Sequence, residues 1–144
     1  MTIAETGVLR PIAMSVLTRR AGPGADLAAL GATAGRAYED LAGVLVPLIG
    51  QAGFEAVTTR ALHLAQREYP SELAADTEQG DAFSRVSSWL KQQDAPLAAA
   101  AAATMFSTLG GLLVTFIGET LTMRLLRKAW PDGFSDSSSE EKPT

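Results

Sequence analysis

The stretch from Ala95 to Gly118 contains no charged side chain, and its composition predicts a helix that is apolar on every side. Such a helix has to be surrounded by other protein or by lipid, because no face of it suits water. A small domain seldom has enough chain to surround one helix completely. What covers this run is therefore the central question: an earlier segment of the same chain, a second copy, another protein, or a membrane.

The rest of the chain indicates an all-α fold. Alanine is the most frequent residue, with 25 copies among 144, and β-branched residues nowhere alternate with polar ones over the length of a strand. We expect one α-helical domain over residues 1–132, built as a four-helix or five-helix bundle. Its first part, 1–24, is an N-terminal arm, in which residues 1–21 form a short helix or strand. Residues 133–144 are expected to be a disordered acidic tail.

Proline, glycine and capping residues place the helix boundaries. The sequence Gly22-Pro23-Gly24 breaks the chain, and Asp26 can cap the first long helix, which Pro47 should kink or end before a corner at Gly50. In the last helix, the pair Gly110-Gly111 favours a bend. The expected long helices span residues 26–46, 51–69, 81–93 and 95–129. Along the first, a heptad seam is expected to face inward: Leu27, Leu30, Ala34, Ala37, Leu41, Val44 and Leu48.

The last helix carries the candidate interaction surface. Leu113, Phe116 and Ile117 lie opposite a ridge of small residues, and burying each is worth roughly 1.5–3 kcal/mol, which is large for a small domain. We expect a homodimer or another protein to cover this surface, which is formed by Leu109, Leu112, Leu113, Phe116 and Ile117. A basic edge beside it would tune the choice of partner, and is formed by Arg124, Arg127 and Lys128.

Two other covers for the same surface stay open at this point. The N-terminal segment, with Ile12, Met14, Val16 and Leu17, can fold back over it. Alternatively, residues 97–118 are long enough to insert into a membrane, although their many alanines and glycines make the transfer energy marginal.

Few residues suggest chemistry. The chain has no cysteine and only one histidine, His63, which excludes thiolate chemistry and any site that needs two histidines; no cofactor or metal is expected. A single histidine on a helix also raises the possibility of phosphotransfer. Histidine phosphotransfer domains carry a basic residue three positions and a glycine four positions later, whereas this chain has Gln66 and Arg67 there. Arg60 and Glu119 are candidates for a structural ion pair.

Charge and composition bound the function further. The net charge is −4, and the tail accounts for half of it, so the balance does not suggest nucleic-acid binding. The alanine content and the excess of arginine over lysine are typical of GC-rich bacterial genomes. The sequence favours a cytoplasmic, non-enzymatic regulatory or scaffolding protein that acts through helix–helix contact and self-associates. A small membrane-associated protein and a phosphotransfer protein using His63 are the alternatives.

Overall fold

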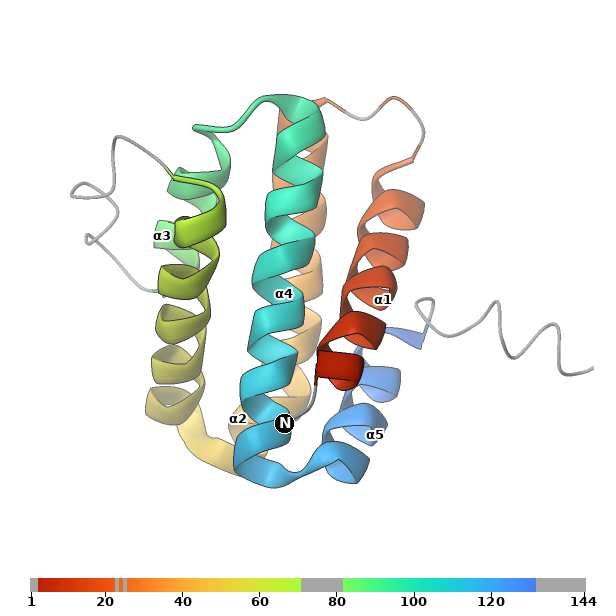
Figure 1. Ribbon diagram of the computed structural model, residues 1–144, viewed down its shortest axis with the longest axis vertical. Helices are drawn as coiled ribbons and strands as arrows, with labels where there is room; N and C mark the ends of the chain where they lie inside the picture. The colour runs from red at the N-terminus through yellow and green to blue at the C-terminus, as the bar shows by residue number, and fades with distance from the viewer. Residues whose placement is uncertain (1–2, 23, 25, 71–81, 132–144) are drawn as a thin grey trace, which may run out of the picture.

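The protein is an all-α bundle, as the sequence predicts (Figure 1). The computed structural model describes residues 3–22, 24, 26–70 and 82–131, and the expected tail at 133–144 and the first residue of the helix expected over 81–93 lie outside them. Five helices follow one another along the chain: α1 (Ile3–Ala21), α2 (Leu27–Glu68), α3 (Ala82–Leu90), α4 (Ala95–Ile117) and α5 (Glu119–Ala129). The N-terminal arm is therefore a full helix, which packs antiparallel to α4.

Helix α2 consists of two helical halves that are joined at a sharp corner. Asp26 caps its first turn, because its side chain accepts a hydrogen bond from the backbone N–H of Ala29 at 2.9 Å. The helix continues through Pro47 and turns at Gly50, whose φ of 86° and ψ of 159° are accessible only to glycine. The first half of α2 (27–49) and the second half (51–68) consequently run side by side in opposite directions (Figure 1).

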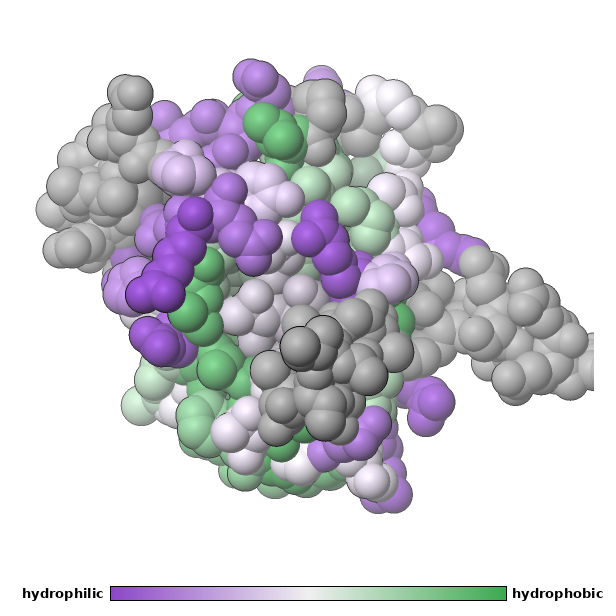
Figure 2. Space-filling model, viewed as in Figure 1, coloured by the Kyte–Doolittle hydropathy of each residue, from purple (hydrophilic) through white to green (hydrophobic). Residues whose placement is uncertain are grey.

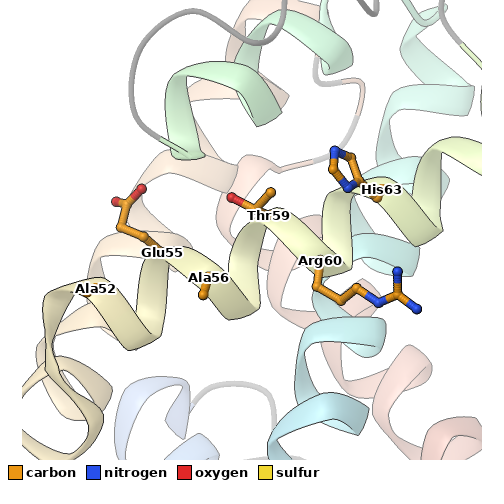
Figure 3. Close-up of a pocket in the computed structure, with 6 residues that line it drawn as sticks. All are labelled: Ala52, Glu55, Ala56, Thr59, Arg60 and His63. Carbon is orange, nitrogen blue, oxygen red and sulfur yellow. The ribbon is translucent and has the colours of Figure 1, made fainter.

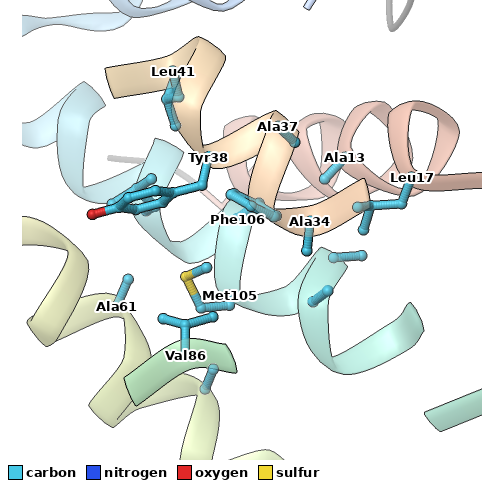
Figure 4. Close-up of a cluster of buried hydrophobic side chains, with 14 of the residues drawn as sticks. Ala13, Leu17, Ala34, Ala37, Tyr38, Leu41, Ala61, Val86, Met105 and Phe106 are labelled. Carbon is cyan, nitrogen blue, oxygen red and sulfur yellow. The ribbon is translucent and has the colours of Figure 1, made fainter. Parts of the chain in front are cut away.

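Helix α4 lies at the centre of the bundle. Both halves of α2 and helix α1 surround it, and α3 and α5 complete the enclosure (Figure 1). Its buried face includes Met105 and Phe106, which point into a cluster with Tyr38 of α2 and Val86 of α3 (Figure 4). The apolar run that dominates the sequence is thus the core helix of the bundle.

The break in the last helix lies at Gly118 and not at Gly110-Gly111, so the expected single helix from 95 to 129 is two helices. Gly118 has a φ of 94°, which turns the chain into α5 within one residue. Gly110 stays helical because α1 packs directly on it: a Cβ atom there would lie 3.0 Å from Cδ1 of Leu9. Gly110 therefore serves close helix packing.

Two buried tryptophans tie the shorter helices to the long ones. The indole N–H of Trp130, at the end of α5, donates to the carbonyl of Ala37 in α2 at 3.0 Å, and its ring meets Phe106 edge-on. The indole N–H of Trp89 in α3 donates to the carbonyl of Tyr69 at 2.7 Å. The partner of each indole N–H is a backbone carbonyl, as is usual for a buried tryptophan that needs a hydrogen-bond acceptor.

Candidate functional site: an apolar end of the bundle

Most of the surface predicted for interaction is buried inside the monomer. Leu109 is 0% exposed and Leu113 is 1% exposed, so neither can contact a partner, and the expectation that they would is wrong. Helix α1 packs along α4, so the alternative of an N-terminal cover is confirmed in part; Phe116, which it was also expected to cover, stays exposed. Ala13, Val16 and Leu17 of α1 join the same core cluster, because α1 lies along α4 with its apolar side inward.

A smaller apolar surface remains outside. Phe116, in the last turn of α4, is 66% exposed, and Leu48, in the last turn before the α2 corner, is 49% exposed. The neighbouring Ile49 and Ile117 are half-buried against the core. We call the residues at this position the apolar end: Val46, Leu48, Ile49, Phe116 and Ile117.

The apolar end is formed where two glycine corners meet. The α2 corner at Gly50 and the α4–α5 corner at Gly118 lie at the same end of the bundle (Figure 1). The corner at Gly50 lies within the uncharged stretch 41–54, and the corner at Gly118 ends the uncharged stretch 95–118. Green and white atoms accordingly gather along the lower edge of the molecule (Figure 2).

Sequence reasoning missed half of this site. Leu48 was assigned to the inward seam of the first long helix, but the seam drifts around the helix. Leu41 and Leu45 are buried, whereas Val44 is half-buried and Leu48 is exposed. An α-helix has 3.6 residues per turn, so a strict heptad drifts by about 20° around the helix with each repeat and by about 60° over three repeats. The absence of charge in residues 41–54 was the available signal.

Helix α5 presents the predicted basic edge. Arg124, Arg127 and Lys128 are all exposed on it, in the turns that lead away from the apolar end. Leu112, the remaining member of the predicted surface, is half-buried against the core, in the turn of α4 above Phe116. The predicted surface therefore divides into a buried part, an exposed apolar end and a basic side.

The predicted ion pair between Arg60 and Glu119 is not formed between these two described residues. Both are exposed, Arg60 on the second half of α2 and Glu119 at the first residue of α5. In the described part of the chain the close ion pair joins Arg20 of α1 to Asp40 of α2 at 2.7 Å. This ion pair therefore supports the alignment of α1 with α2.

The surface around His63 is shallow and does not converge on the imidazole. A depression of about 550 Å³ is lined by residues of a single helix: Ala52, Glu55, Ala56, Thr59, Arg60 and His63. Figure 3 shows Thr59 and His63 on one side of that helix and Arg60 on the other. Glu55 is already engaged, because its carboxylate accepts the backbone N–H of Ala82 and so caps the start of α3. No second group is aimed at the exposed histidine within this depression.

Among the described residues, two helices are long and apolar enough to cross a membrane by length and composition alone. The apolar window of α4, within Leu97–Ile117, is 72% buried inside the bundle, as expected of a core helix. The window in α2 is only 28% buried. Insertion of residues 97–118 into lipid would require the bundle to open, because α1 and α2 already occupy the surroundings of α4.

Comparison with known proteins gives no indication of function, so the proposal below depends on the geometry of the bundle. No protein-family model matches the chain, and searches of curated proteins and of solved structures found no match.

Proposed function

We propose that this protein is a non-enzymatic regulatory or scaffolding module that self-associates through its apolar end. The observation that carries the proposal is the exposure of Phe116 and Leu48, each next in sequence to a half-buried isoleucine, at the end of the bundle where both corners lie. Large apolar side chains exposed at one end of a soluble domain favour an interaction site there.

A second copy suits this patch better than a charged partner or an anionic membrane. The end itself carries no basic residue, and the ionisable groups nearest the corners along the chain are Glu55 and Glu119. Basic residues follow further along the same helices, Arg60 on α2 and Arg124 on α5. An isologous contact needs a self-complementary surface, and two copies that meet end to end can place acidic groups of one opposite basic groups of the other.

The energetic gain is sufficient for a weak dimer. Burying a fully exposed phenylalanine or leucine side chain is worth roughly 1.5–3 kcal/mol, and a symmetric contact buries each residue twice. Losses of rotational and translational freedom oppose this gain. We therefore expect a reversible dimer that forms at micromolar or higher concentrations. The basic side of α5 is expected to set the orientation of the two copies.

The test is the molar mass in solution of the full chain, measured by sedimentation over a range of concentrations. Wild type should approach twice the monomer mass as concentration rises, and both Phe116→Glu and Leu48→Glu should stay monomeric. The matched control is Leu97→Glu, because Leu97 is 48% exposed but lies near the start of α4, at the opposite end of the bundle. This control should associate like wild type.

Three results would contradict the proposal. Wild type could remain a monomer throughout, Phe116→Glu could dimerise normally, or Leu97→Glu could be as defective as Phe116→Glu. Sedimentation with phosphatidylcholine vesicles tests the alternative that the apolar end binds lipid. A monomeric wild type that binds vesicles, with a Phe116→Glu variant that does not, would assign the apolar end to lipid instead of a second copy.

A further inference from the structure

A second, separate feature lies between the start of α2 and the end of α3. There a groove of about 610 Å³ opens on the surface, a volume in the range of small-molecule sites. Its walls come from the first two turns of α2 and the last turn of α3. The lining residues are Leu27, Ala28, Gly31, Ala32, Ser87, Leu90 and Lys91.

Gly31 leaves space in the groove, although no neighbouring atom requires a glycine at this position. Glycine is a poor helix former, and Gly31 stands in the interior of α2. A Cβ atom added there would meet nothing within 4 Å. Gly35, one turn later, differs, because its added Cβ would lie 3.5 Å from the ring of Phe83. Packing thus accounts for the small residue at 35, whereas at 31 the missing side chain only enlarges the groove.

The chemistry of the lining is apolar with one positive charge. Leu27 and Leu90 supply the large apolar side chains, and the alanines leave space between them. Lys91 is the only charged lining residue; it is exposed, and its ammonium group has no hydrogen-bond or ion-pair partner among the described residues. The nearby carboxylate of Asp26 is turned toward its own helix, where it accepts the N–H of Ala29.

We propose that this groove binds a small amphiphilic anion, with an apolar body between Leu27 and Leu90 and a carboxylate-type head against Lys91. Apolar contact would supply most of the affinity, and the ammonium group would select for negative charge. The site is independent of the apolar end, since it involves none of the same residues.

Decanoate is the probe, with decanol and decyltrimethylammonium as neutral and cationic analogues, and binding to the full chain is measured by titration calorimetry. Decanoate should bind saturably and more tightly than decanol, and the cation should not bind. Lys91→Gln should weaken decanoate about tenfold, as expected when a charge-assisted hydrogen bond is lost. Gly31→Leu should remove saturable binding, because the new side chain fills the groove.

The matched control is Gly43→Leu in the same helix, where an added Cβ also meets nothing within 4 Å but which does not line this groove. It should bind decanoate like wild type, and circular dichroism should show that both leucine variants retain their helices. Phe116→Glu should also bind normally, which separates this site from the apolar end. Equal affinity for the cationic analogue, unchanged binding by Gly31→Leu, or no saturable binding by wild type would each overturn the proposal.

Discussion

The contact between Leu9 and Gly110 decides whether α1 is a true part of the core. Leu9 is 3% exposed, so Leu9→Ala should cost about 2–5 kcal/mol of unfolding free energy through lost burial and a cavity. Gly110→Leu places a Cβ atom 3.0 Å from Cδ1 of Leu9. Overpacking of this kind costs about 1–3 kcal/mol, and the gain in helix propensity returns about 1 kcal/mol.

The double variant Leu9→Ala/Gly110→Leu tests the geometry directly. The new leucine enters the space that the old one leaves, so the double variant should be more stable than the sum of the two single changes by at least about 1 kcal/mol. Urea unfolding, followed by the fluorescence of the buried Trp89 and Trp130, measures all four proteins. As a control, Leu9→Ala combined with Gly43→Leu should be additive, because Gly43 faces open space.

Additivity within about 0.5 kcal/mol for the pair at 9 and 110 would refute the reasoning. It would mean that α1 does not pack against α4 at this point. The covering of α4 by its own N-terminal segment would then lose its main support, and the buried part of the predicted interaction surface would become available again.

Further predictions concern caps, anchors and charge. Asp26→Ala should cost about 0.5–2 kcal/mol in urea unfolding, because a cap hydrogen bond is lost. Asp94→Ala should cost clearly less, since the Asp94 side chain makes no cap hydrogen bond; equal losses would contradict this. Trp130→Phe removes a buried hydrogen bond and should lower stability by at least about 0.5–1.5 kcal/mol, whereas an unchanged urea midpoint would refute the anchoring role. Arg20→Gln breaks the half-exposed pair with Asp40 and should cost at most about 1 kcal/mol, a loss that disappears in about 1 M NaCl.

The sequence predicted elements whose boundaries depend on local chemistry. The Asp26 cap, the corner at Gly50 and the start of α4 after Asp94 are all confirmed, because capping and positive φ are properties of a few adjacent residues. The bend expected at Gly110-Gly111 was wrong because glycine can serve either flexibility or close packing. At Gly110 the glycine serves packing because Leu9 of α1 lies against it. The two residues are about a hundred positions apart, so local sequence does not show this contact.

The candidate site was predictable only in part, for the same reason. Phe116 and Ile117 were identified from an uncharged run, which is a local property. Leu109 and Leu113 lie in the same run but face α1 and the core, which only the tertiary arrangement determines. Leu48 escaped notice because its exposure depends on how far the α2 seam drifts before the corner.

The two single-residue corners also explain why the apolar end is so poor in polar atoms. Ordinary connecting loops add several residues, with polar side chains and unpaired peptide groups, to the end of a bundle. Gly50 and Gly118 reverse the chain without any such addition. The insertion of polar residues beside either glycine would hydrate this end of the molecule. Whether cells tolerate such insertions beside Gly50 and Gly118 therefore tests whether the apolar end has to exclude water in vivo.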